Sequence, residues 1–222
     1  MTWWAQRLWE INPAYLGAWV FWVIFSIVLH ELAHGVAAIR CGDDTPIVTG
    51  HMTWNPLVHM GQTSLILFAL CGLCWGMMPV NPSRFRGKYD DAYVAFAGPL
   101  VNLCLWVVCI LASVIWLVYF KDVSNPLREN MFMFWTTGAM LNLLLFLFNL
   151  APIPPLDGSR ILANFSPPYE RFLRTEAGAV ASIIGAGVLF WFGGRYFQAQ
   201  ASDATSWTIV HGAALLRGAA PP

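Results

Sequence analysis

The sequence predicts an all-α polytopic membrane protein, and three observations support this fold class. Hydrophobic residues make up 58% of the 222-residue chain and charged residues only 11%, whereas a soluble domain of this size carries far more charge. Several apolar runs are long enough to form helices that cross a bilayer. The chain also contains twelve Trp and fifteen Phe, and aromatic side chains are favoured at membrane interfaces. The formal net charge is zero, so no basic face is expected for a nucleic-acid partner.

The first predicted helix runs from residue 13 to residue 39. Asn12 suits the N-cap position, and Pro13 suits the first helical turn. Arg40 and the following "CGDD" supply a basic residue and then a glycine stop. The preceding "MTWWAQRLWEIN" has one Arg and no small-residue cleavage site. We therefore expect this apolar run to remain as a helix of the mature protein rather than to act as a signal peptide.

Residues 42–80 are expected to differ from the long helices. The stretch 42–63 predicts a loop or a short β-hairpin, because Pro46, Gly50 and Pro56 interrupt it. The stretch 64–80 is apolar, but with about 16 apolar residues it falls short of the ~20 that a spanning helix needs. We therefore predict that it is re-entrant or lies shallow in the membrane.

Three further helices are predicted over residues 91–120, 131–150 and 176–192. The last is expected to end at "GGR", which makes residues 171–195 an accessory C-terminal helix, and the tail after residue 200 has only a weak pattern. No polar stretch is long enough to form a second domain, so the sequence predicts one membrane-embedded domain over residues 1–222.

The basic residues indicate how the helices are oriented. If the 64–80 segment returns to the side from which it entered, seven basic residues share one side of the membrane and five lie on the other. Cytoplasmic faces carry the excess of Lys and Arg, so the first helix is expected to end at the cytoplasmic side. The larger group consists of Arg40, Arg84, Arg86, Lys88, Arg160, Arg171 and Arg174, and the smaller of Arg7, Lys121, Arg128, Arg195 and Arg217.

The first helix carries the sequence "HELAH" in its lower half, where ionisable groups are costly in lipid. In a helix, His30 and His34 lie on one face, one turn apart, so their imidazoles can bind one Zn²⁺ ion. Glu31 is rotated by about 100° from His30, which suits it to act on a metal-bound water as the general base of an H-E-x-x-H motif. The alternatives are a polar patch inside a helix bundle and the proton relay of a transporter.

A catalytic zinc site needs a third protein ligand. Asp157 is the best candidate, because it follows the 131–150 helix directly and the prolines of "APIPPLDG" cannot continue that helix. In the re-entrant topology this helix ends on the same side as His34, whereas a spanning 64–80 segment would place Asp157 on the opposite side. The other imidazoles considered as ligands are His51, His59 and His211.

Three motifs together carry a family resemblance. "HELAH", "FAGPLVN" at 96–102 and "NLAPIPPLDG" at 149–158 resemble the site-2 protease family of intramembrane zinc metalloproteases, in the compact prokaryotic branch without a PDZ domain. The resemblance implies a catalytic core within about residues 14–162. It implies that one Zn²⁺ per chain is held by His30, His34 and Asp157, and that Glu31 is the catalytic acid and base.

The resemblance also implies a substrate and a location. The reaction would be hydrolysis of a peptide bond in or near a transmembrane segment of a membrane-protein substrate, within the bilayer of a prokaryotic cell membrane and toward its cytoplasmic side. Asn102, Asn149 and His59 are expected near the site as substrate, oxyanion or supporting residues. The non-enzymatic alternatives are a zinc-binding membrane scaffold and an ion transporter with an intramembrane His/Glu/Asp cluster.

Overall fold

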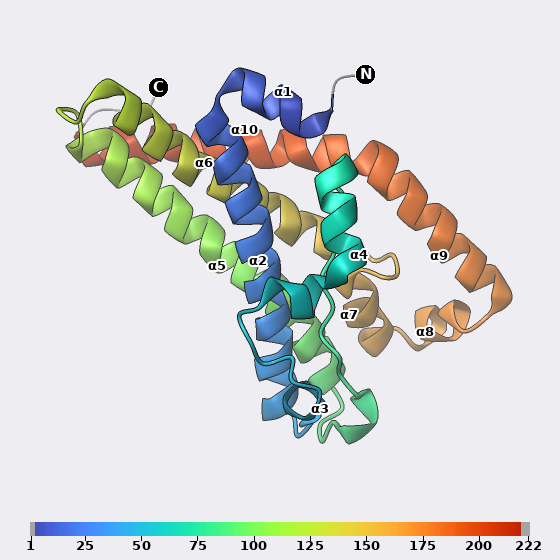
Figure 1. Cartoon of the computed structure of the whole chain (residues 1–222). Helices are drawn as coiled ribbons and strands as arrows, with labels where there is room; N and C mark the ends of the chain where they lie inside the picture. Colours follow the sequence, from blue (N-terminus) through green and yellow to red (C-terminus); the bar gives the residue numbers. More distant parts are fainter. Residues whose placement is uncertain (1–2, 219–222) are drawn as a thin grey trace.

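The computed structural model describes residues 3–218, and within that range it contains ten α-helices, one 3₁₀ turn, one π-helical turn and no β-strand. The first two and last four residues of the predicted single domain lie outside this range. The elements (Figure 1) are α1 (Trp4–Ile11), α2 (Pro13–Arg40), α3 (Thr45–Val48), α4 (Pro56–Cys71), η1 (Pro82–Arg84), α5 (Asp90–Tyr119), α6 (Asn125–Asn149), α7 (Asp157–Phe165), α8 (Pro167–Leu173), α9 (Glu176–Val188), η2 (Leu189–Gly193) and α10 (Gly194–Leu216).

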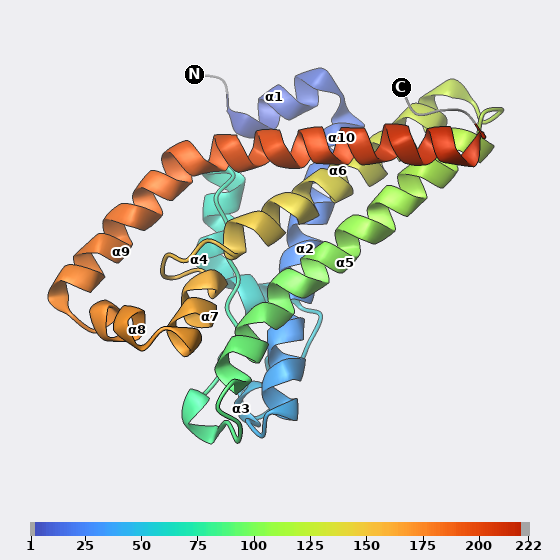
Figure 2. The same ribbon diagram turned by 180° about the vertical axis from the view of Figure 1, so that it is seen from behind.

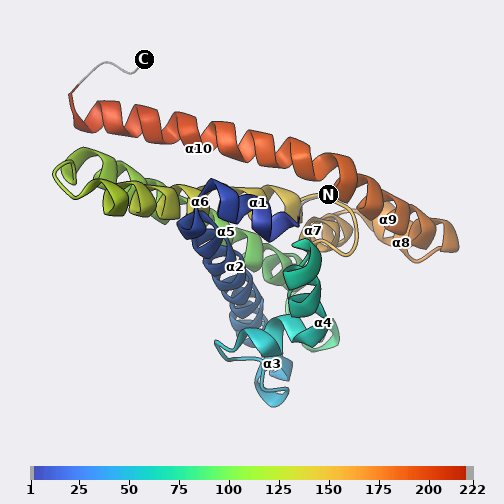
Figure 3. The same cartoon turned by 45° about the horizontal axis from the view of Figure 1, so that its top comes forward.

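Four of the described helical segments are long and apolar enough to cross a membrane: α2, α5, α6 and the continuous stretch Glu176–Leu216. This confirms the predicted fold class, and the chain is an integral membrane protein. Helices α5 and α6 form a long pair that α2 crosses, and α10 lies along this pair (Figure 2). The view in Figure 3 shows α1 and α10 on the side of the molecule opposite α3.

Helix α2 begins where the sequence predicts. The Asn12 side chain accepts a hydrogen bond from the backbone N–H of Ala14, and Pro13 occupies the first helical turn. Further along α2, the Trp22 ring lies against α6 at Gly138, where a Cβ would come within 2.3 Å of the ring. The buried core continues between α2, α5 and α6 with Val23, Ile27, Cys109, Ile110, Val114 and Leu141.

The segment between α2 and α5 adds a short helical turn before the predicted apolar segment. Asn55 caps this turn and Pro56 begins it, and the chain then kinks at Gly61, where φ is 68° and ψ is 167°, before the apolar part of α4. Helix α4 ends at Cys71, where Gly72 adopts the left-handed conformation that ends many helices. The stretch 42–63 therefore holds α3 and the start of α4, with no strand in it, and residues 73–81 have no regular secondary structure.

This segment leaves and returns at one end of α2. The backbone N–H of Asn81 donates to the carboxylate of Asp43, which places the end of the stretch 73–81 beside the loop that follows α2. With 16 residues, α4 is too short to cross the bilayer. The segment thus begins and ends at the same end of α2, and its re-entrant or shallow position in the membrane stays a prediction.

The C-terminal part corrects the prediction that the last helix stops at Gly193 and Gly194. Both glycines have helical φ and ψ values, and the chain passes through the π-helical turn η2 directly into α10. The tail expected to be weakly patterned is therefore a long helix. It packs on α5 and α6 through a stripe of residues spaced four apart, namely Ala201, Thr205, Ile209 and Ala213. Helix α6 likewise begins six residues earlier than predicted, at Asn125.

Candidate metal and catalytic site

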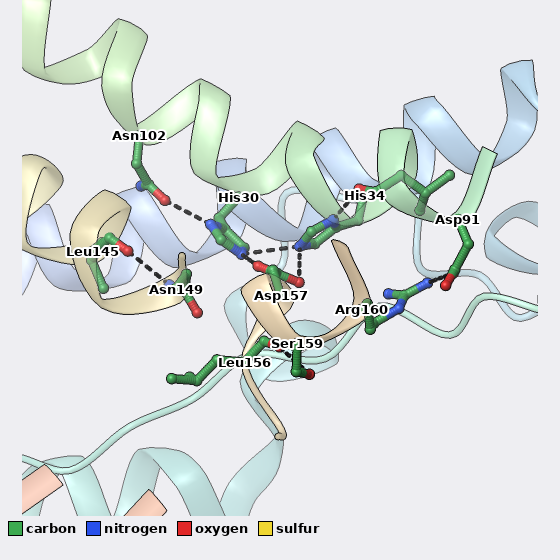
Figure 4. Close-up of polar contacts among 11 residues, drawn as sticks. His30, His34, Asp91, Asn102, Leu145, Asn149, Leu156, Asp157, Ser159 and Arg160 are labelled. Atoms are coloured by element: carbon green, nitrogen blue, oxygen red, sulfur yellow. Dashed lines mark hydrogen bonds and ion pairs between the residues drawn. The ribbon is translucent and has the colours of Figure 1, made fainter. Parts of the chain in front are cut away.

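Three ligand-type atoms converge between α2 and α7 (Figure 4). His30 Nε2 lies 3.0 Å from His34 Nε2 and 3.1 Å from Asp157 Oδ2, and His34 Nε2 lies 3.4 Å from Asp157 Oδ1. All three side chains are buried. They form a cluster whose ligand atoms lie within 4.8 Å of one another.

Local sequence explains why these groups meet. The i, i+4 spacing stacks the two imidazoles on one face of α2. Asp157 is the first residue of α7, and the turn that precedes it folds back tightly: a Cβ on Gly158 would lie 2.2 Å from the Leu150 carbonyl oxygen. Gly98 on α5 leaves the room for both rings, since a Cβ there would lie 2.5 Å from each Nε2 atom.

The hydrogen bonds on the far side of each ring orient the site. His34 Nδ1 lies 2.7 Å from the Val94 carbonyl oxygen, which can only accept, so this nitrogen carries the proton. His30 Nδ1 lies 2.6 Å from Asn102 Oδ1 and donates in the same way. Both Nε2 atoms therefore present lone pairs to the same point as the Asp157 carboxylate.

This donor set fits a zinc ion. Two imidazole nitrogens and one carboxylate with an open fourth position are the ligands of a catalytic zinc site, and tetrahedral bonds of about 2.0–2.1 Å place ligand atoms about 3.3–3.4 Å apart. The observed separations of 3.0–3.4 Å agree with that geometry. Lone pairs that face one another in a buried space also require a cation between them.

The charge of Asp157 suits the same role. Burial acts to raise the pKa of Asp157, but the adjacent imidazoles of His30 and His34 lower it by more, so the pKa lies well below its ordinary value. The carboxylate is therefore ionised at neutral pH. One helical turn further along α7, Arg160 pairs with Asp91 of α5 at 2.6 Å and fixes α7 against α5.

Glu31 lies beside this cluster in a cavity of about 490 Å³. Its side chain is 7% exposed and has no hydrogen-bond partner among the described residues. Gly76, in the non-helical stretch 73–81, lies against it, because a Cβ on Gly76 would lie 2.5 Å from Glu31 Oε1. Asn149 lines the same cavity, and its Nδ2 donates to the Leu145 carbonyl oxygen at 3.0 Å.

The remaining imidazoles lie elsewhere. His59 is buried, and its Nε2 donates to the Thr53 carbonyl oxygen at 2.7 Å, so it holds the loop before α4 rather than lining the cavity. His51 contacts Thr49 through Nδ1. His211 bonds its own helix α10.

Comparisons with known proteins agree with this geometry. The profile described as Peptidase family M50 matches residues 111–192, a range that includes Asp157 but not the "HELAH" motif. "Putative zinc metalloprotease YwhC" of Bacillus subtilis is 35% identical over 167 residues, which cover 74% of this chain and 76% of that protein. No solved structure matches.

More distant relatives carry similar names. "Putative zinc metalloprotease Rip2" of Mycobacterium tuberculosis is 30% identical over 172 residues, 72% of this chain and 63% of that protein. "Zinc metalloprotease MJ0392" of Methanocaldococcus jannaschii is 28% identical over 181 residues, 78% of this chain and 44% of that protein. The chain thus spans less than two thirds of the length of these two relatives.

Proposed function

The chain belongs to peptidase family M50, the site-2 protease family of zinc metalloproteases, and on that premise we propose that it cleaves membrane proteins within the bilayer. The bond hydrolysed lies in or near a transmembrane segment of the substrate. His30, His34 and Asp157 hold one Zn²⁺ per chain, and Glu31 is the acid and base. The single observation that carries this proposal is the convergence of three ligand atoms, from His30, His34 and Asp157, next to a cavity that Glu31 and His30 line.

The site residues of this chain have different roles in the proposed hydrolysis. A zinc ion bound at the cluster supplies a water that is acidic enough to ionise near neutral pH and a positive charge for the developing oxyanion. Glu31 accepts the proton of the attacking water and later delivers it to the leaving amine. The Nδ1 hydrogen bonds of His30 and His34 hold the two rings so that both Nε2 atoms face the position of the metal.

Substrate must approach as extended backbone, because a helix hides its carbonyl groups. The stretch 73–81 offers an edge for such a segment. Its Trp75 N–H is bonded to Ser64 and its Met77 N–H to the His59 carbonyl, both toward α4, whereas the Gly76 N–H and C=O have no partner among the described residues. A substrate strand paired along Gly76 would pass beside Glu31.

The orientation follows from the basic residues. In the predicted grouping, Arg40 at the end of α2 shares its side with six of the other eleven Lys and Arg residues, while α1 and the α5–α6 turn lie at the other end (Figure 1). This charge difference supports the proposal that the site lies toward the cytoplasmic side of a prokaryotic cell membrane.

The test pairs metal analysis with cleavage. Wild type and Glu31→Gln are purified in detergent, zinc is counted per chain, and both are incubated with a panel of single-span membrane proteins. One zinc in each protein with cleavage by the wild type alone supports the proposal. Zinc in both without cleavage by either favours the non-catalytic zinc-binding scaffold. A well-folded wild type without zinc contradicts the metal site.

A further inference from the structure

A buried row of side-chain amides runs from the candidate metal site into the helix pair behind it. His30 Nδ1 lies 2.6 Å from Asn102 Oδ1 on α5. Asn102 Nδ2 donates to Asn142 Oδ1 on α6 at 3.0 Å, and Asn142 Nδ2 donates to the Gly138 carbonyl oxygen at 2.9 Å. Both asparagines are 0% exposed, in helices that are otherwise strongly apolar.

The direction of this row is set by its last member. A backbone carbonyl oxygen only accepts, so the amino group of Asn142 must face Gly138 and its oxygen must face Asn102. The amino group of Asn102 then faces Asn142, and the Asn102 oxygen faces His30. That oxygen in turn requires a proton on His30 Nδ1, which leaves the lone pair on Nε2.

We infer that Asn142 is a positioning residue, which fixes the metal-binding tautomer of His30 through Asn102. An amide alone can turn either its oxygen or its amino group toward an imidazole, and only the anchored orientation makes Nε2 a ligand. His34 needs no such relay, because its Nδ1 donates directly to the Val94 carbonyl. The inference rests on the metal-holding role proposed above for His30, His34 and Asp157.

The first experiment reads the tautomer in metal-free protein. Histidine labelled with ¹⁵N distinguishes protonated from unprotonated ring nitrogens at alkaline pH, where the imidazoles are neutral, and a His30→Gln variant assigns the signals. Wild type shows a protonated Nδ1 on His30. Asn142→Leu, which keeps the side-chain size, shows a mixture of tautomers. Thr137→Val is the matched control, a buried polar position on the same helix, and leaves the His30 signals unchanged.

The second experiment measures Zn²⁺ affinity by competition with a chelator. Asn142→Leu is expected to weaken binding by about 10–100-fold, the usual cost of losing an outer hydrogen-bond partner of a ligand. Asn102→Asp in the Asn142→Leu protein restores the affinity, because a carboxylate accepts from Nδ1 without an anchor. A purely structural contact between α5 and α6 would not be rescued in this way.

A further variant keeps the inference testable if Asn142→Leu does not fold. Asn142→Asp keeps an acceptor toward Asn102 and is expected to keep both the tautomer and the zinc affinity of wild type, even if Asn142→Leu does not fold. The inference is overturned if Asn142→Leu keeps the wild-type tautomer, or if the affinity lost in Asn142→Leu is not restored by Asn102→Asp. Absence of zinc binding in wild type defeats the proposed metal site instead, and the tautomer measurement still decides the role of Asn142.

Discussion

Two apolar regions of this chain are packed in opposite ways. In the site core, made of α2, α5 and α6, 28–39% of the residues in the most apolar window are buried, whereas in the C-terminal arm, made of α9 and η2, the share is 6%. Only Gly178 is buried in the arm. Composition marks both regions as membrane spans. It does not indicate which of them other helices cover.

Polar residues distinguish the two regions. In the site core, some buried polar side chains bond across helices, as Asn102 does to Asn142 and Trp22 to the Phe134 carbonyl, while others, such as Ser113, bond their own helix. In the arm, the hydroxyl of Ser182 bonds the Gly178 carbonyl of its own helix. Buried polar groups therefore mark where helices meet, and substitutions should act strongly in the core and weakly in the arm.

The largest difference is expected between two glycines. Gly98→Ala places a methyl group 2.5 Å from both His Nε2 atoms, whereas no atom lies within 4 Å of a Cβ on Gly187 in α9. We expect Gly98→Ala to weaken zinc binding by more than about 100-fold and to abolish cleavage, because the ligands must separate. Gly187→Ala should leave both unchanged. Metal analysis of the two variants decides the matter, and a zinc-loaded Gly98→Ala protein would contradict the described geometry.

A second contrast concerns packing. Leu141 is 4% exposed in the core between α2 and α6, and Ile184 is 60% exposed on α9. Leu141→Ala should lower the free energy of unfolding by about 2–5 kcal/mol, because it leaves a cavity. Ile184→Ala should change it by less than about 0.5 kcal/mol. Chemical denaturation in the same detergent measures both. Equal losses would mean that the arm is packed as the core is.

Much of the site core could be predicted from the sequence, because polar residues and prolines restrict the arrangements that the helices can adopt. Two histidines and a glutamate in an apolar helix need a partner, and the prolines before Asp157 must end a helix. The structure brings together the three predicted ligands for these reasons. Asn142 was missed, although a lone amide in an apolar helix is a signal of the same kind.

The arm was predicted less well. Gly193 and Gly194 suggest a helix end in water, but in lipid an interrupted helix would leave backbone groups without partners, so the helix continues through both. Pro56 reads as a break in the sequence, whereas after the capping Asn55 it begins a short helical turn that ends at the kink at Gly61. Whether a Gly or a Pro ends, continues or begins a helix thus depends on its neighbours and on the surrounding medium, and not on the residue alone.

A third prediction concerns the stability of the protein at acid pH and Asp43, which lies in the loop after α2. Asp43 is 0% exposed; burial acts to raise its pKa, but hydrogen bonds from Asn81 and Thr45 hold the pKa below its ordinary value. The folded protein thus gains stability above the unfolded pKa of about 3.9, and loses it as the pH falls through the lower folded value.

Asp43→Asn should remove about 2 kcal/mol of this stability near neutral pH, because an amide cannot accept all three bonds as a carboxylate does. It should also flatten the loss below about pH 4. Thermal melting across pH measures both effects. Asp44→Asn is the control, since its pair with Arg84 is exposed and contributes little. An acid-side loss as steep in Asp43→Asn as in wild type would exclude Asp43 as its source.

The smallest effect compares the loss of a helix cap in the two regions; Asn12 in addition donates from Nδ2 to Asn130 Oδ1 of α6 at 3.1 Å, a bond across helices that the arm cap lacks. Asn12 caps α2 and Thr175 caps α9, each by accepting a hydrogen bond from a backbone N–H of the first turn. Replacing either by Ala should cost about 1 kcal/mol locally. In Asn12→Ala the loss should appear in global unfolding, because α2 is packed into the core. In Thr175→Ala it should appear only as faster hydrogen exchange of the first turn of α9, since the exposed arm can open without the core. A global loss in Thr175→Ala would show that the arm and the core unfold as one unit.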